Sequence, residues 1–188
     1  MAEDRMPPIP EGALTEAQRK AAAAFAAERR RPPFGPFVPL LRSPELMLRA
    51  AAMGEYLRYR NALPRRLSEL AILMVSRLWT QQFEWHHHLP DAVAAGLDPA
   101  TAEAIAEGRR PEPIAEDEAI VYEFAVELER NRSVSDATYA RARERLGEQG
   151  IIDLVGICGY YGLLGMVMNV ARTPLPAGAR PPLAPFPA

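Results

Sequence analysis

The sequence predicts an all-α fold, with a single helical domain between two proline-rich arms. No segment alternates apolar and polar residues over the length of a strand, whereas several stretches combine helix start signals with apolar residues at helical spacing. The 19 prolines cluster near residues 7–10, 32–44 and 174–187 and leave the centre nearly free of them. Proline lacks an N–H group and fixes φ, so the clusters favour arms that wrap the body or a neighbouring subunit, or fray. The expected parts are an N-terminal helix and arm (1–42), a helical domain (43–172) and a C-terminal tail (173–188).

The first part of the chain should hold two helices with irregular chain between them. Residues 14–31 are rich in alanine and arginine, and Thr15 is a candidate N-cap. Residues 32–39 contain proline and phenylalanine in a pattern that predicts an irregular loop packed on an apolar surface. Ser43 is the expected cap of a helix that has Pro44 at its first position and runs towards Arg60.

The centre of the chain predicts a buried helix followed by the helix that carries the histidines. Residues 64–78 are apolar on most faces, so this helix should be central. Thr80 is a candidate cap for a helix that continues to Ala95 and stops at Gly96. Similar patterns predict further helices at residues 98–108, 115–131 and 136–147.

The last predicted helix, residues 151–170, is almost uncharged after Asp153. Its uncharged stretch is shorter than a bilayer requires, and it carries glycine at every third position: Gly156, Gly159, Gly162 and Gly165. Such a stripe allows another helix to approach closely, in a protein core, at a subunit interface or in a membrane. We favour a buried core or subunit-interface helix over a membrane segment.

Composition excludes several classes of function. The net charge of −2 offers no basic excess for nucleic acid. A single cysteine, Cys158, excludes an intrachain disulfide and a Cys-x-x-Cys redox pair, and its apolar setting predicts a small core residue with a raised pKa. The acidic N-terminus lacks the apolar region of a secretory signal, so we expect a cytoplasmic protein.

All three histidines lie together at His86, His87 and His88, close to Glu84. On a helix, Glu84 shares a face with His88 and with His87, while His86 points elsewhere. A glutamate one turn before a histidine can orient the imidazole for acid–base work. Two alternatives remain open, namely a surface ion pair and, because Glu-x-x-His spacing occurs in helical-bundle metal proteins, a mononuclear metal site that includes Glu69.

Glu69 lies on the otherwise apolar central helix. A buried carboxylate is costly unless it is paired, and burial would suit it to proton transfer. The alternative is an exposed first-turn glutamate favoured by the helix dipole. Arg65 and Arg66 nearby, and Arg42 further away, could bind a carboxylate, but in an arginine-rich chain a solvated surface charge is the favoured interpretation of each.

The central segment resembles a known family. The run from residue 63 to 88, with Glu69, Glu84, Trp85 and His88, and the following Ala94-Ala95-Gly96-Leu97 are similar to the carboxymuconolactone decarboxylase family, which includes the AhpD-like alkylhydroperoxidases. The resemblance covers about residues 43–108, and the glycine-rich last helix also resembles the family's C-terminal helix. It implies an AhpD-like helical bundle that assembles as a trimer or hexamer.

The resemblance also separates two branches of this family. AhpD-like relatives carry a Cys-x-x-Cys pair ahead of the histidine, and alignment on Glu69 and His88 places Gln81 and Glu84 at those positions. Without these thiols, peroxide reduction by a dithiol cycle is chemically unavailable. The run from Glu84 and Trp85 to His88 resembles the decarboxylase branch, whose members act on small lactone or carboxylic-acid metabolites without a cofactor.

We therefore expect a cofactor-independent decarboxylase (a lyase) or isomerase that binds no metal, acts on a small molecule and contacts neither nucleic acid nor a membrane. The expected catalytic residues are His88 as the proton donor, Glu84 as the group that orients it, and Glu69 as a second proton-transfer group or tuning partner. The expected substrate contacts are Arg65, Arg66, Trp85 and His87. The alternative is a metal-binding or non-catalytic helical oligomer on the same scaffold, and hydroperoxidase activity is disfavoured.

Overall fold

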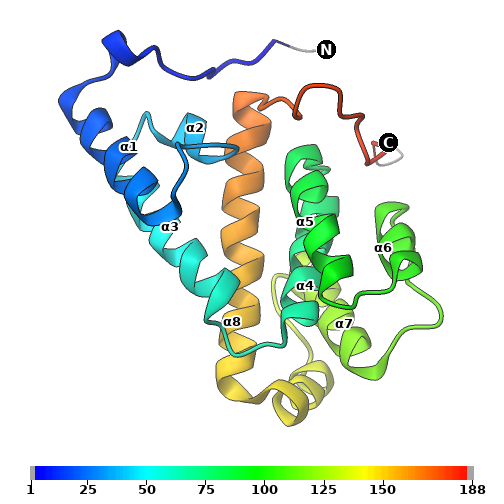
Figure 1. The fold of residues 1–188 in the computed structure, drawn as a ribbon. Coiled ribbons are helices and arrows are strands. Elements are labelled where there is room, and N and C mark those ends of the chain that lie inside the picture. The colour runs from blue at the N-terminus through cyan, green and yellow to red at the C-terminus, as the bar shows by residue number, and fades with distance from the viewer. Residues whose placement is uncertain (1–2, 186–188) are drawn as a thin grey trace.

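The computed structural model describes residues 3–185 and is helical, with no strand in that range (Figure 1). This confirms the predicted all-α class. The elements are the 3₁₀ helix η1 (Glu11–Ala13) and the α-helices α1 (Glu16–Arg29), α2 (Phe37–Leu40), α3 (Pro44–Tyr59), α4 (Arg65–Leu78), α5 (Gln82–Ala94), α6 (Pro99–Ala106), α7 (Glu116–Asn131) and α8 (Asp136–Ala171).

Helices α4 and α8 organise the core. Figure 1 shows α8 between the α1–α3 group and the α4–α7 group, and α4 packs against α5, α6, α7 and α8. The apolar side chains of α4, among them Leu67, Leu70 and Leu73, are fully buried. Each such side chain contributes about 1.5–3 kcal/mol by leaving water, so α4 is the central helix that its sequence predicted.

Several helix starts follow the predicted chemistry. Thr15 and Gln18 form a reciprocal capping box at the start of α1, as the sequence indicated. Pro44 occupies the first turn of α3, but the Ser43 side chain accepts no capping hydrogen bond there. Ser43 is therefore the N-cap residue of α3, as predicted, but it caps the helix without a side-chain hydrogen bond.

Two local predictions are corrected around α2 and α5. Residues 37–40 form a short helix despite Pro39, because the first N–H groups of a helix have no acceptor within it and proline is tolerated there. Thr80 adopts a left-handed backbone with φ 45°, and Gln81 caps α5 by accepting from the Phe83 N–H at 2.7 Å.

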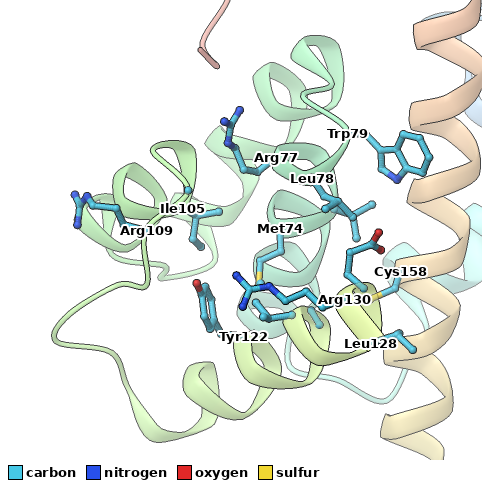
Figure 2. A pocket seen from close by; sticks show the side chains of 15 residues that line it. Met74, Arg77, Leu78, Trp79, Ile105, Arg109, Tyr122, Leu128, Arg130 and Cys158 are labelled. Atoms are coloured by element: carbon cyan, nitrogen blue, oxygen red, sulfur yellow. The ribbon is translucent and has the colours of Figure 1, made fainter. Parts of the chain in front are cut away.

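Helix α8 contains both of the last two predicted helices. Its ribbon is continuous, but Gly147 has non-helical angles (φ 70°, ψ 173°) that separate the two segments. The glycine stripe is used mainly inside the molecule, because Gly162 and Gly165 face the Trp79 side chain, which lies against α8 in Figure 2. Among residues 3–185, α8 alone is long and apolar enough to cross a membrane, but more than half of its apolar window is buried, as in a core helix.

Both proline-rich arms contact the chain's own body in the described residues. Arg42 donates a hydrogen bond to the Pro7 carbonyl at 2.8 Å, so it holds the N-terminal arm in place and does not contact the candidate site. Leu183 of the tail is buried, and its backbone exchanges two hydrogen bonds with the Gln82 side chain. Residues 1–2 and 186–188 of the predicted arms lie outside the described residues, and the boundaries at 42/43 and 172/173 stay predictions.

Replacement of Gly54 by alanine should destabilise the fold, because an added Cβ would overlap the buried Tyr160 hydroxyl. We expect a loss of about 1–3 kcal/mol in the free energy of unfolding, measured by urea denaturation. Gly159→Ala is the matched control, since no atom lies within 4 Å of its added Cβ. The control should be neutral or gain up to about 1 kcal/mol from helix propensity. Equal effects of the two changes would contradict this packing.

Candidate active site

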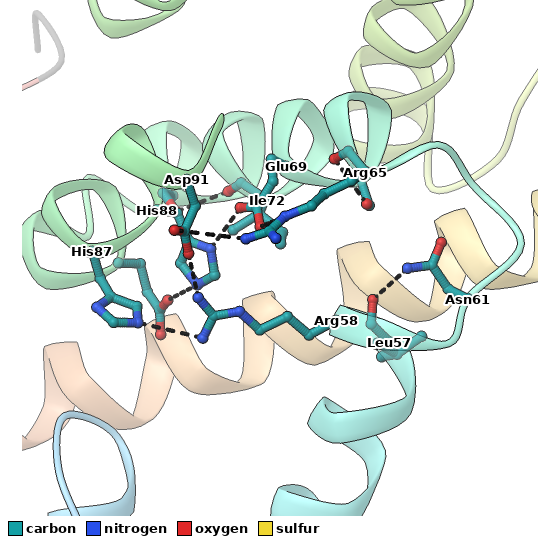
Figure 3. Close-up of polar contacts among 12 residues, drawn as sticks. Leu57, Arg58, Asn61, Arg65, Glu69, Ile72, His87, His88 and Asp91 are labelled. Atoms are coloured by element: carbon teal, nitrogen blue, oxygen red, sulfur yellow. Dashed lines mark hydrogen bonds and ion pairs between the residues drawn. The ribbon is translucent and has the colours of Figure 1, made fainter. Parts of the chain in front are cut away.

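Glu69, Glu84 and His88 meet between α4 and α5 and are 1%, 3% and 2% exposed. His88 donates from Nδ1 to Glu69 Oε2 at 2.8 Å, and its Nε2 lies 3.4 Å from Glu84 Oε2 (Figure 3). The second contact follows from helical spacing, whereas the first depends on the packing of α4 against α5. The three residues that the sequence singled out therefore form one buried cluster.

The two carboxylates determine the protonation of His88. Burial by itself lowers the pKa of the His88 imidazole, but the hydrogen bonds and negative charges of Glu69 and Glu84 outweigh burial, so the net pKa is raised. The Tyr161 ring meets the imidazole edge to face, with centroids 5.1 Å apart. His88 is thus held as an imidazolium with a carboxylate at each nitrogen.

A second layer of charges surrounds this cluster. Arg58, mostly buried at the end of α3, forms an ion pair with Asp91 of α5. Arg65 is half exposed and lies 3.6 Å from Asp91 and 3.8 Å from Glu69. Two guanidinium groups and the imidazolium together balance the three carboxylates, which a largely buried cluster requires.

Sequence reasoning did not identify Arg58 or Asp91. Asp91 follows His88 at a spacing of three, so helical periodicity could have placed it on the same face. Arg58 lies on a separate helix and carries no local signal. Its Nε is buried without a hydrogen-bond partner among the described residues, and Figure 3 shows its guanidinium between His87 and Asp91.

His87 is held in the neutral form. Arg58 donates from an Nη1–H to His87 Nε2 at 3.4 Å, which requires that nitrogen to be unprotonated. Burial, with the positive charges of His88 and Arg58, lowers the pKa of His87 to about 4. Its ring stacks on Phe83 and lies near Phe34. The pKa values of the two adjacent histidines are therefore shifted in opposite directions.

A small cavity of about 30 Å³ lies against this cluster. Its wall includes Glu84, His87, His88, Arg58 and the two tyrosines of α8, Tyr160 and Tyr161, whereas Glu69 lies behind His88 and does not line it. One or two waters would fill this volume. An open groove of about 850 Å³ shares Arg29, Phe34, Arg58 and His87 with the cavity, so these side chains stand between the cavity and the groove.

The other predicted substrate contacts lie away from this cavity. Arg66 forms ion pairs with Asp117, at 2.8 Å, and with Glu118, both on α7. These ion pairs join α4 to α7, so the role of Arg66 is structural. Trp85 is buried in the core and does not line the cavity. Arg65 pairs with Glu69 and Asp91 outside the wall, so His87 alone of the four lines the cavity.

The residues aligned with the Cys-x-x-Cys pair of AhpD-like proteins have other roles in this protein. Gln81 is buried, and besides capping α5 it donates from Nε2 to Asn169 of α8 at 2.8 Å. Cys158 lies on α8 and lines a different cavity, and burial raises the pKa of its thiol to about 12. No thiol therefore stands beside His88.

The fold and this cluster define an AhpD-like helical protein with a buried carboxylate–histidine site. A crystal structure of alkylhydroperoxidase AhpD core, an uncharacterized peroxidase-related protein from Ralstonia eutropha JMP134, superposes with a TM-score of 0.74. The similarity covers 94% of this chain and 95% of that chain at 17% identity, so it concerns the fold. Residues 44–116 match the model of the carboxymuconolactone decarboxylase family, so the central segment of the chain is similar to that family. No curated protein matches the chain significantly.

Removal of the charge on Glu69 should lower the pKa of His88. Glu69→Gln keeps a hydrogen-bond acceptor for Nδ1 but removes the negative charge, so we expect the pKa of the His88 imidazole to fall in an NMR titration. Glu45→Gln, an exposed change on α3, is the control and should leave that pKa unchanged. An unaltered His88 pKa in Glu69→Gln would contradict the assigned pairing.

Proposed function

We propose that this protein is a cofactor-independent decarboxylase or isomerase of the carboxymuconolactone decarboxylase type, acting on a small lactone or carboxylic acid. The observation that carries the proposal is the buried imidazolium of His88, held between two carboxylates at a cavity wall. The match of residues 44–116 to the carboxymuconolactone decarboxylase family supports this class of reaction. The raised pKa of His88, caused by the hydrogen bonds and charges of Glu69 and Glu84, favours the protonated form and suits His88 to act as a general acid.

This arrangement accounts for the source of each proton in the proposed reaction. When the carbon–carbon bond to the carboxylate breaks, carbon dioxide leaves and the electron pair stays on the substrate as a dienolate. The dienolate carbon then takes a proton from His88. Glu84, which faces both the cavity and Nε2, can carry that proton and later return one from solvent to the imidazole. In the isomerase version, the same pair removes a proton at one carbon and returns it at another.

Glu69 acts as a positioning residue in this proposal. It accepts the Nδ1–H and so fixes the ring with Nε2 towards Glu84 and the cavity. It also stabilises the imidazolium between turnovers. Because Glu69 does not line the cavity, it acts on the substrate only through His88.

Arg58 is the proposed carboxylate contact, in place of Arg65 and Arg66. Its guanidinium lines both the small cavity and the open groove next to His87 and Phe34, as does that of Arg29, which donates to the Ala51 carbonyl. A guanidinium binds a carboxylate through two parallel hydrogen bonds. The cavity is too small for a lactone acid, so we propose that Phe34 moves aside when substrate enters from the groove.

His88→Gln should reduce turnover of lactone acids, followed as release of carbon dioxide, by about 10²–10⁴-fold, since it removes the general acid. His86→Gln is the matched control because His86 is exposed on the same helix. The control should keep full activity, and both variants should keep the wild-type molar mass in light scattering. Wild-type turnover in His88→Gln would end this mechanism.

Metal binding is the second candidate function. Glu69, His88 and Asp91 each offer a ligand atom, and these atoms lie within 4.8 Å of one another. Carboxylate and imidazole ligands suit several divalent metals. However, Arg58 and Arg65 already pair with these carboxylates, and their positive charges oppose a cation at the same place.

Metal analysis of the purified protein separates these candidates. Because the arginines neutralise the site, we expect less than stoichiometric zinc, iron or manganese in both the wild type and Asp91→Asn. One metal ion per chain that is lost in Asp91→Asn and in Glu84→Ala would favour the metal-binding oligomer instead. Asp98→Asn, a change at the α6 cap, is the control for nonspecific loss.

The proposal also includes assembly and location. We propose a homo-oligomer, a trimer or hexamer, in the cytoplasm. The exposed apolar side chains of α8, among them Ile152, Met166 and Val170, support assembly. Thiol-dependent peroxide reduction is disfavoured, because the sole cysteine is remote from His88.

A further inference from the structure

A second cavity lies on another side of α4. It has a volume of about 190 Å³ and is enclosed by α4, α6, α7 and α8 (Figure 2). Its walls are largely apolar and include Met74, Leu78, Ile105, Tyr122 and Leu128. It shares no lining residue with the cavity beside His88, so it is a separate site.

Three arginines are among the residues that line this cavity. Figure 2 shows Arg77, Arg109 and Arg130 arranged around the apolar side chains, and Glu129 is the single acidic residue in the lining. Arg132 pairs with Glu129 at 2.9 Å, which neutralises that carboxylate. An anionic group at the mouth would therefore meet an excess of positive charge.

The three arginines differ in what they already bind. Arg77 donates to the Ala184 carbonyl of the C-terminal tail, and Arg109 pairs with Glu107. Arg130, exposed at the end of α7, has no hydrogen-bond or ion-pair partner among residues 3–185. Its guanidinium is therefore available to bind a carboxylate through two hydrogen bonds.

We propose that this cavity binds an amphipathic monocarboxylate, with its apolar body among the side chains of α4, α6 and α7 and its carboxylate at Arg130. The volume sets the size of the ligand, because a cavity of about 150 Å³ accepts one benzene ring. A body of a single ring or a short acyl chain therefore fits 190 Å³. The ligand binds without covalent chemistry, since the buried Cys158 thiol stays protonated.

Octanoate is the probe, and octan-1-ol is the neutral comparison. Trp79 lines the cavity, so binding should change its fluorescence, and calorimetry gives the affinity. We expect saturable octanoate binding, at least about tenfold tighter than that of octan-1-ol, as for an added charge-assisted pair. Arg130→Gln should weaken octanoate binding about fivefold or more, whereas Arg49→Gln, an exposed change on α3, should have no effect.

Filling the cavity provides a second test. Val126 lines the cavity and is only partly buried, so Val126→Phe should occupy the space and reduce octanoate binding more than about tenfold, with folding checked by circular dichroism. His88→Gln should leave octanoate binding unchanged, which separates this site from the proposed active site. Should Val126→Phe fail to fold, the octanoate and octan-1-ol comparison in wild type and Arg130→Gln decides.

Three results would overturn this inference. Equal affinity for octanoate and octan-1-ol would remove the role of the arginines. Loss of binding in His88→Gln, with retention in Val126→Phe, would place the probe at the other cavity. A concentration-dependent molar mass that falls in Arg130→Gln would show that a second copy of the chain covers the mouth instead.

Discussion

The hydrogen bond between His88 and Glu69 is the interaction on which the site depends. It joins α4 to α5 at a place where both partners are nearly inaccessible to solvent. A buried imidazolium or carboxylate alone would cost several kcal/mol, so each requires the other. Once this pair is buried, Glu84 and Asp91 add negative charge, and Arg58 and Arg65 balance it. The charge balance thus brings α3 as well as α4 and α5 into one site.

Two separate cavities lie on different faces of helix α4. One face carries Glu69, which holds His88 against the small cavity. Met74 and Leu78 lie on another face and line the larger apolar cavity. The two differ in their charged residues: the first is lined by Glu84, His88 and Arg58, and the second by three arginines and Glu129. A single apolar helix can serve both because its side chains project in all directions from the axis.

The absence of redox cysteines beside His88 changes what the same scaffold can do. Gln81, at the first of these positions, caps α5 and binds Asn169 of α8. Glu84, at the second, adds a carboxylate where a relative would carry a thiol. A carboxylate at this position raises the pKa of His88 and favours proton transfer. The likeness to a peroxidase-related fold is therefore compatible with different chemistry at the site.

The sequence by itself determined the all-α class, the course of most helices and the shared helix face of Glu84 and His88. These follow from periodicity, capping residues and i,i+4 spacing, which are local properties of the chain. Only the tertiary structure decided that Glu69 is buried behind His88, that Arg58 reaches the site from α3, and that Arg66 turns instead to α7. Contacts between helices depend on how the helices pack, and a single sequence carries no local signal for that.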